Sequence, residues 1–193
     1  MPLNHTADAA ALRQQIRTEF SSIQPLDALE RKQIAAALAW LDSGAELCRL
    51  AKPATPPKHL VSYFAVVDDG HVLLVDHKNA QLWLPPGGHV EAAEHPRAAV
   101  LRELEEELGF TASHAIQPPL LLTVTTTVGL TAGHTDVSLW YIVRASRSQQ
   151  IHFDESEFNA VRWFPFAEVP LARSDPHMDR FLKKLHNARQ ATA

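Results

Sequence analysis

Two stretches near the start of the chain show the spacing of amphipathic helices. Apolar side chains recur there every three or four positions, which places them on one face of a helix. The stretches are residues 6–19 and 25–50, and the apolar stripes comprise Leu12, Ile16, Phe20, Ile34, Leu38 and Leu41. A proline-rich connector at residues 53–57 ends this region. We therefore predict an N-terminal helical accessory segment, residues 1–52, ahead of a domain that spans residues 58–193.

After the connector the pattern changes to that of strands. Two apolar runs flank Asp68-Asp69-Gly70, which is a strong hairpin signal. Later runs are rich in threonine and valine, residues that favour strands. The predicted strands are residues 60–67, 71–75, 120–128, 135–143 and 160–164, and Asp175-Pro176 opens a closing helix. A mixed sheet with helices on both faces, an α/β sandwich, follows from this order.

The middle of the chain carries the end signals of another helix. Pro96 suits the first helical turn and Gly109 the position after the last turn, with no breaker between them. The preceding Pro85-Pro86-Gly87-Gly88 predicts a turn rather than a strand or helix. Helical spacing divides the remaining residues into an apolar face and an acidic face. The apolar face comprises Leu101, Leu104 and Leu108, and the opposite face Glu103, Glu106 and Glu107.

Three glutamates this close together repel one another. Like charges three or four positions apart cost an isolated helix about 0.2–0.5 kcal/mol per pair. A cation relieves this cost, and clustered carboxylate oxygens suit Mg²⁺, which keeps waters and substrate phosphate oxygens in its shell. Arg102 can hold Glu103 through a bidentate pair, and Glu94 can engage Arg102 in turn. An acidic run by itself is typical of a solvated helix face, so the interpretation depends on the ordered residues around it.

Those ordered residues resemble the Nudix box, the signature of the Nudix hydrolases. The box reads Gly, five residues, Glu, seven residues, Arg-Glu, an apolar residue, any residue, Glu-Glu, any residue, Gly and an apolar residue. Residues 88–110 match at every specified position, with Gly88, Glu94, Arg102, Glu103, Leu104, Glu106, Glu107, Gly109 and Phe110. So many spaced matches make the signal specific. The resemblance extends over about residues 58–188.

The resemblance implies a Nudix-type α/β/α sandwich with a mixed sheet, and it implies a reaction class. Water attacks a phosphorus of a nucleoside diphosphate linked to another group, while Mg²⁺ or Mn²⁺ neutralises the pyrophosphate and lowers the pKa of a bound water. The family pattern makes Glu103 and Glu107 metal ligands and Glu106 a further ligand or the general base. It also makes the carbonyl of Gly87 a ligand.

Many relatives place one more glutamate outside the box, in a loop before a strand. Asp154, Glu155 and Glu157 precede Trp163 in this chain. By its distance from that tryptophan we choose Glu157 as metal ligand or general base, while a polar loop is the alternative for all three residues. A general base must reach the attacking water.

Substrate-binding residues are less clearly marked. Aromatic side chains can stack on a base, or they can belong to the core. The candidates are Phe64, Trp83 and Trp140 for stacking, His89 for a phosphate, His134 and Asp136 for the pocket wall, and Asp175 for reading a base or capping the last helix. We expect a nucleoside triphosphate, standard or oxidised, as the first substrate class. Nucleotide sugars, ADP-ribose and CDP-alcohols are the alternatives.

Composition limits the partners. The chain of 193 residues has 46% hydrophobic residues, a formal net charge of −4 and a single cysteine, Cys48. Residues 1–52 hold six basic and six acidic side chains, so no basic face predicts nucleic-acid binding. Without a signal peptide or membrane-length apolar stretch we expect a cytoplasmic protein. The first helices are expected to pack on the domain or to form a homodimer, with a lid over the substrate as the alternative. A non-catalytic nucleotide-sensing regulator is the alternative function of another class.

Overall fold

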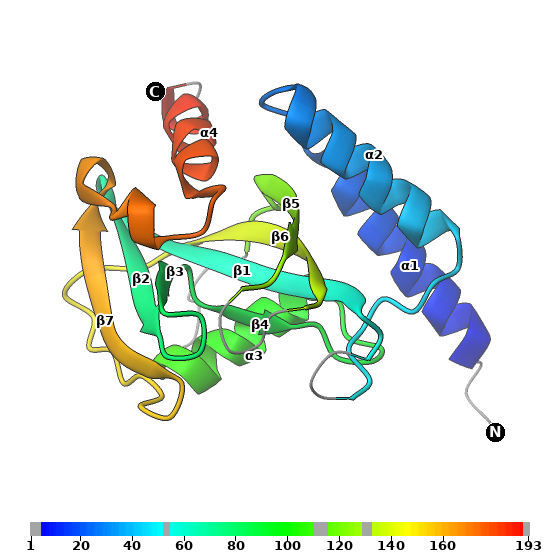
Figure 1. Ribbon diagram of the computed structural model, residues 1–193, viewed down its shortest axis with the longest axis horizontal. Coiled ribbons are helices and arrows are strands. Elements are labelled where there is room, and N and C mark those ends of the chain that lie inside the picture. The colour runs from blue at the N-terminus through cyan, green and yellow to red at the C-terminus, as the bar shows by residue number, and fades with distance from the viewer. Residues whose placement is uncertain (1–4, 52–54, 110–115, 129–132, 191–193) are drawn as a thin grey trace.

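The computed structural model describes residues 5–51, 55–109, 116–128 and 133–190, and Figure 1 labels its elements. The helices are α1 (His5–Ser22), α2 (Ala28–Asp42), α3 (Pro96–Leu108) and α4 (Met178–Gln190). The strands are β1 (Lys58–Asp68), β2 (His71–His77), β3 (Leu82–Leu84), β4 (Gly87–His89), β5 (Leu121–Thr126), β6 (Thr135–Arg144) and β7 (Phe158–Pro165). Two short 3-10 turns, η2 (Phe166–Glu168) and η3 (Leu171–Arg173), lead from β7 to α4.

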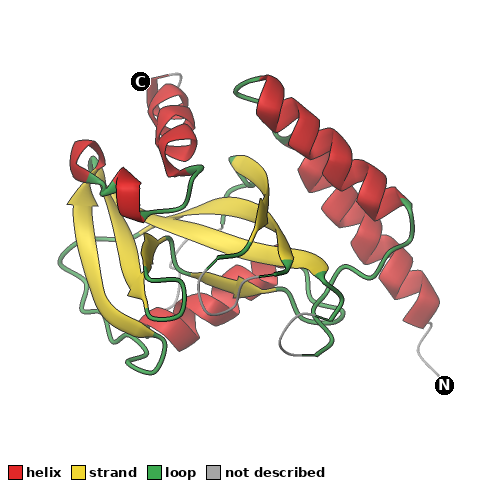
Figure 2. Ribbon diagram, in the orientation of Figure 1, coloured by secondary structure: helices red, strands yellow, loops and turns green. Residues whose placement is uncertain are grey.

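Within these ranges, seven strands form one mixed sheet, drawn in yellow in Figure 2. The order across the sheet is β3-β2-β1-β6-β5, with β4 beside β1 and β7 beside β2. β1 runs parallel to β6, and its other neighbours are antiparallel to it. The parallel register sets His59 beside Asp136 and Tyr63 beside Trp140. Polar residues far apart in the sequence thereby come together near the start of β1 and β6.

Helices cover both faces of the sheet, which confirms the predicted sandwich. Figure 1 shows α3 on one side of the strands and α4 on the other. Leu104 and Leu108 of α3 belong to one buried cluster with Phe64 and Tyr141, whereas Phe181 of α4 belongs to a second cluster on the opposite face. Successive side chains of β1 and β6 point to opposite faces of the sheet, so each strand contributes residues to both clusters.

The N-terminal helices pack against the rest of the chain. Ile16, Phe20 and Leu41 lie in the same buried cluster as the apolar residues of α3. Glu19 of α1 forms an ion pair with Arg97, and the hydroxyl of Tyr141 donates to Glu19 at 2.6 Å. The residues predicted as an accessory segment thus contribute to the core that supports α3.

Two helix predictions need correction. The helix predicted over residues 25–50 ends at Asp42, because Gly44 adopts a left-handed conformation with φ 78°. In α3, Leu101 is exposed, although helical spacing predicted it on the buried face. The buried face is centred one position round the helix, where Val100, Leu104 and Glu107 meet the sheet. A carboxylate therefore occupies a position that apolar spacing alone assigns to a leucine.

The diglycine segment was also predicted wrongly. Gly87 and Gly88 form part of β4, a short strand that pairs with Val61, Ser62 and Tyr63 of β1. Gly87 has φ 151°, and a Cβ there would lie 2.2 Å from the Ser62 carbonyl oxygen. Only glycine allows the backbone to approach β1 this closely. The segment is therefore a strand whose sequence lacks strand-forming residues.

Candidate active site

The box helix has the termini that its sequence predicts. Pro96 is the first helical residue, and the side chain of His95 accepts a hydrogen bond from the Arg97 N–H. Gly109 ends the helix in the left-handed conformation, with φ 69°. The last box position, Phe110, lies outside the described residues. Between these ends, α3 presents Glu107 and Glu103 to β4, where they approach Gly87 and Gly88.

Glu107 is the most buried carboxylate of the box, with 5% of its surface exposed. Its Oε2 accepts a hydrogen bond of 2.9 Å from the backbone N–H of Gly87, which links α3 to β4. Burial raises the pKa of Glu107 well above its usual value, and the charge of Glu103 adds to the rise. A carboxylate held in this way is poised to accept a cation, since a positive ion would favour its charged form.

Arg102 organises the other acidic residues. Its guanidinium forms a two-bond fork with Glu94, with both N–O distances 3.0 Å, and donates to the His89 carbonyl oxygen at 3.1 Å. One guanidinium nitrogen also lies 2.7 Å from Glu103 and 3.2 Å from Glu106. Arg102 therefore connects β4, the loop that carries Glu94 and one face of α3. The contacts expected for Arg102 and Glu94 are present.

The two remaining box glutamates differ in exposure. The Glu103 side chain is 14% exposed and the Glu106 side chain 60%. Burial raises the pKa of Glu103, and the Arg102 guanidinium opposes that rise. Gly88 lies against Glu103, because a Cβ at residue 88 would be 1.9 Å from Glu103 Oε1. The box glycine thus leaves room for this carboxylate, which a side chain would displace.

The loop before β7 closes against the end of the box helix. The backbone N–H of Asp154 donates to the Glu107 carbonyl oxygen at 3.2 Å, and that of His152 donates to the Leu108 carbonyl oxygen at 3.1 Å. Glu157 is exposed, and its charge contributes to raising the pKa of both Glu103 and Glu107. Glu157 is therefore close to the box glutamates, although the loop lies some fifty residues further along the chain.

These carboxylates fit a divalent ion of the magnesium type. The group offers only oxygen ligands, in accordance with the preference of Mg²⁺ and Mn²⁺. Burial and then the charges of neighbouring carboxylates raise the pKa of Glu103 and Glu107, and a bound cation would oppose both effects. The residues expected to hold the ion are Glu103, Glu107 and Glu157, and Glu106 and the Gly87 carbonyl are further candidates.

Tyr63 interacts electrostatically with one box glutamate and with two candidate substrate residues. Burial raises the pKa of Tyr63 well above its usual value, and three carboxylates add to this rise, namely Asp175, Asp136 and Glu107. Asp175 is buried, and its pKa is raised to about 6, first by burial and then by Asp136. Tyr63 is therefore near enough to Glu107, Asp136 and Asp175 to respond to the charge of each.

Trp83 is the remaining aromatic candidate at this edge. It packs edge-to-face on Phe164 with a centroid distance of 5.1 Å, and its carbonyl oxygen accepts a 2.6 Å hydrogen bond from the Ser174 hydroxyl. The bond brings β3 next to Asp175, whose side chain accepts a 2.7 Å hydrogen bond from the His177 N–H. Asp175 thus shapes the start of α4 while lying near Trp83.

Two other aromatic candidates belong to the core instead. Trp140 is fully buried, and its Nε1 donates to the Thr123 hydroxyl at 3.0 Å. Phe64 is also fully buried, in the cluster that includes the apolar residues of α3. Since neither ring has an exposed face, we leave both out of the substrate site. A tryptophan on a central strand is buried in the core when helices cover both faces of the sheet.

Sequence reasoning missed two residues of this region. Tyr63 alternates with core residues along β1, and His59 stands one residue after the start of that strand. Both are adjacent to Asp136 or Trp140 only through the parallel register of β1 and β6. No local pattern predicts that register, because four strands and the box helix lie between β1 and β6 along the chain. The available signal was a histidine, His59, directly before the strand predicted at residues 60–67.

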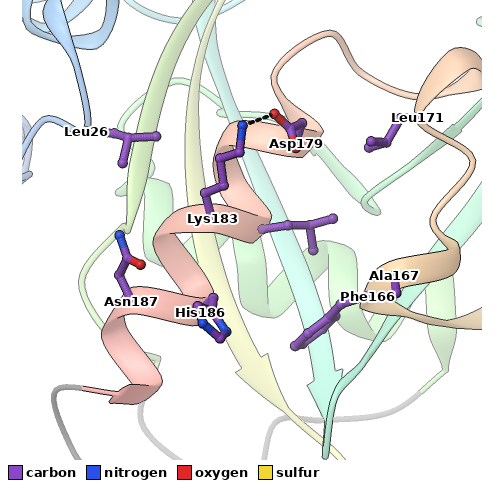
Figure 3. A pocket seen from close by; sticks show the side chains of 9 residues that line it. Leu26, Phe166, Ala167, Leu171, Asp179, Lys183, His186 and Asn187 are labelled. Carbon is purple, nitrogen blue, oxygen red and sulfur yellow. Dashed lines mark hydrogen bonds and ion pairs between the residues drawn. The ribbon is translucent and has the colours of Figure 1, made fainter.

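A separate pocket of about 640 Å³ lies along α4 (Figure 3). Its lining includes Leu26, Phe166, Leu171 and Lys183, with His186 on the next turn of α4. No box glutamate lines it. The pocket is formed by η2, η3, α4 and Leu26, and none of Tyr63, Trp83 and Asp175 lines it either, so it is distinct from the candidate active site.

Comparisons with known proteins agree with this arrangement. The NUDIX domain family matches residues 58–185, so the chain belongs to that family. A MutT-like protein of Streptomyces ambofaciens is 29% identical over 136 residues, which are 69% of this chain and 82% of the relative. The crystal structure of a MutT NUDIX hydrolase from Burkholderia pseudomallei is 27% identical, with a TM-score of 0.54, and the match covers 66% of this chain and 97% of that one.

A third comparison bears on the fold. The solution structure of the E. coli ORF135 protein superposes with a TM-score of 0.55 at 24% identity, covering 69% of this chain and 92% of that protein. Together, the family match and the intact box define the protein as a Nudix pyrophosphohydrolase, an enzyme of a family that generally uses divalent metal ions and acts on small nucleotide-derived substrates. Among the described residues, no helix is both long and apolar enough to span a bilayer.

Proposed function

We propose that this enzyme hydrolyses a phosphoanhydride bond of a nucleoside triphosphate with Mg²⁺ or Mn²⁺. The observation that carries the proposal is the convergence of Glu103, Glu107 and Glu157 beside the glycine strand. Oxygen ligands at this density suit a metal that also binds phosphate oxygens. The bound ion would neutralise the diphosphate and lower the pKa of the attacking water.

The protein residues have separate roles in this proposal. Glu107 and Glu103 hold the ion, and the Gly87 N–H keeps Glu107 in place through its 2.9 Å hydrogen bond. Arg102 fixes Glu103 and is itself fixed by Glu94. Glu157 or the exposed Glu106 takes the proton from water, since each stands at the solvent side of the carboxylate group.

The nucleoside is placed on the α4 face of the sheet. After burial, the charges of Asp175 and Glu107 both raise the pKa of Tyr63, which relates the box to the Trp83 region. Trp83 offers an aromatic ring, and Asp175 a carboxyl group with a pKa of about 6 that can donate or accept a hydrogen bond near neutral pH. A base can therefore be bound by stacking and by one polar contact.

The test is a substrate panel with matched variants. Purified enzyme is assayed with Mg²⁺ against nucleoside triphosphates, oxidised triphosphates, nucleotide sugars, ADP-ribose and CDP-alcohols, and the products are identified. Glu107→Gln should lower turnover at least about a hundredfold, because loss of a metal ligand costs several kcal/mol at about 1.4 kcal/mol per tenfold. Glu105→Gln, on an exposed position of the same helix, should retain turnover.

Each outcome has a distinct meaning. Faster hydrolysis of a nucleotide sugar, ADP-ribose or CDP-alcohol would replace the triphosphate proposal by that class. Tight nucleotide binding without any turnover would favour the nucleotide-sensing regulator. Equal turnover in the Glu107 and Glu105 variants would refute the assigned metal site whatever the substrate.

A further inference from the structure

Three histidines and one aspartate converge outside the box glutamates. His59, His89, His134 and Asp136 each present one ligand atom, and these four atoms lie within 4.8 Å of one another. The rings of His59 and His134 stack with centroids 5.0 Å apart, and His89 lies 4.8 Å from His59. They come from β1, from the end of β4 and from the start of β6, so the sheet itself assembles the group.

Two buried atoms of this cluster lack a hydrogen-bond partner. His59 has no exposed surface, and its Nε2 is 3.4 Å from Asp136 Oδ1. Both atoms are buried without a hydrogen bond. On the other side of its ring, His59 Nδ1 lies 2.9 Å from the Pro56 carbonyl oxygen, which can only accept. Nδ1 therefore carries the proton, and a neutral His59 directs the lone pair of Nε2 at the carboxylate.

This arrangement is unfavourable unless a positive charge lies between the two atoms. A buried acceptor without a donor costs about 1–3 kcal/mol. A protonated His59 would pair with Asp136, but such charge-assisted bonds are about 2.7–2.9 Å long, shorter than the distance here. A metal ion satisfies both atoms at once, since it accepts lone pairs from nitrogen and oxygen.

The spacing fits a tetrahedral ion. Asp136 Oδ1 is 3.4 Å from His59 Nε2 and also 3.4 Å from His134 Nε2. Ligands bound to Zn²⁺ at about 2.0–2.1 Å on a tetrahedron are separated by about 3.3–3.4 Å. Outer hydrogen bonds orient the rings: Pro56 holds His59, and the Thr127 hydroxyl lies 3.2 Å from His134 Nδ1. Such partners are typical of histidines that bind metal.

His89 provides the fourth position. Its Nε2 lies 3.4 Å from a guanidinium nitrogen of Arg49, a long contact that metal binding through this nitrogen would replace. Its backbone carbonyl accepts a hydrogen bond from Arg102, so the same residue is connected to the box. The two groups still differ in chemistry, because the box offers only oxygen ligands and this cluster is rich in imidazole.

We propose that His59, His134 and Asp136, completed by His89, bind one divalent transition-metal ion of the zinc class at a site separate from the magnesium site of the box. Imidazole ligands favour Zn²⁺ and its neighbours, whereas Mg²⁺ prefers oxygen. The ion would connect β1, the end of β4 and the start of β6. The proposal is independent of which nucleotide the enzyme cleaves.

The experiment measures metal binding rather than catalysis. Metal-free protein comprising residues 1–193 is titrated with Co²⁺ in the presence of a large excess of Mg²⁺, and the visible absorption typical of tetrahedral cobalt is followed. We expect one equivalent to bind and Zn²⁺ to displace it. Zn²⁺ should also raise the melting temperature of the wild-type protein.

Variants locate the ion. His134→Gln and Asp136→Asn should each weaken Co²⁺ binding at least about a hundredfold, because loss of an outer partner alone costs about 10–100-fold. The box variant Glu107→Gln and the surface control His186→Gln should bind as the wild type does. If His134→Gln does not fold, as judged by circular dichroism, the half-buried His89→Gln replaces it. A wild-type protein without tetrahedral cobalt, or variants of the cluster that bind cobalt normally, would overturn the proposal.

Discussion

Lys184 and Lys183 are adjacent lysines of α4 that form ion pairs of similar length in opposite environments. Lys184 Nζ lies 2.5 Å from Glu30 Oε1 and 2.7 Å from the Gln24 carbonyl oxygen, and the two side chains are only 7% and 0% exposed. Lys183 Nζ lies 2.6 Å from Asp179, with the side chains 62% and 50% exposed. Replacing each lysine by methionine therefore separates the effect of burial from that of pairing.

The expected effects differ by several kcal/mol. Lys184→Met leaves the Glu30 carboxylate buried and without its cation, although the Leu26 N–H still donates to it at 2.6 Å. Removing one partner of a buried pair costs about 3–5 kcal/mol. Lys183→Met removes an exposed pair on one helix, which is worth about 0.3–0.5 kcal/mol. We therefore expect the first substitution to lower the free energy of unfolding by at least about 2 kcal/mol more than the second.

Urea denaturation at neutral pH measures both values, with equal slopes required for the comparison. The double variant Lys184→Met with Glu30→Gln should recover part of the loss, because it removes the unpaired charge. The reasoning would fail if the Lys184 and Lys183 variants were equally stable. The result also reports on the N-terminal helices, because this pair joins α4 to α2.

Three further predictions follow from the site. Asp175→Asn should be more stable than the wild type by up to about 3 kcal/mol above pH 6, and the difference should vanish below about pH 4. The reason is that the raised pKa of Asp175 makes the free energy of unfolding of the wild type fall as pH rises through this range. Urea titrations at several pH values in EDTA test this. Gly88→Ala should lower turnover and weaken Mn²⁺ binding measured by calorimetry, because the new Cβ would meet Glu103, and unchanged binding would contradict this. Glu157→Gln should reduce turnover at saturating metal far more than Glu155→Gln does, and equal rates would remove Glu157 from the site.

Local signals predicted most of the elements. Apolar periodicity located α1, α4 and the longer strands to within a few residues, and Pro96 and Gly109 marked the ends of α3. The strand β4 was not predictable in this way, because its glycines have no strand propensity. What makes Gly87 part of a strand is its pairing with Tyr63, and such pairing depends on the tertiary fold.

The site shows the same division. The spacing of the box placed Glu103 and Glu107 on one side of a helix, and the structure adds that Glu107 faces the sheet. The group of His59, His134 and Asp136 has no sequence signature. It exists because two strands that are distant in the chain run parallel and in register. The sequence predicts which residues share a face of one helix or strand. Which residues of different strands meet depends on the packing of the whole domain.

The contact of Glu19 with Arg97 has a consequence for how this enzyme can be altered. Arg97 stands in the first turn of the box helix, and Glu19 belongs to a helix that lies entirely outside the region matched to the family. We therefore expect the orientation of the box glutamates to depend partly on a neighbour that the family pattern does not contain. A shortened protein that keeps residues 58–185 would retain every signature residue and yet leave Arg97 and the Tyr141 hydroxyl without their shared acceptor, so loss of activity on truncation would not by itself argue against the chemistry of the box.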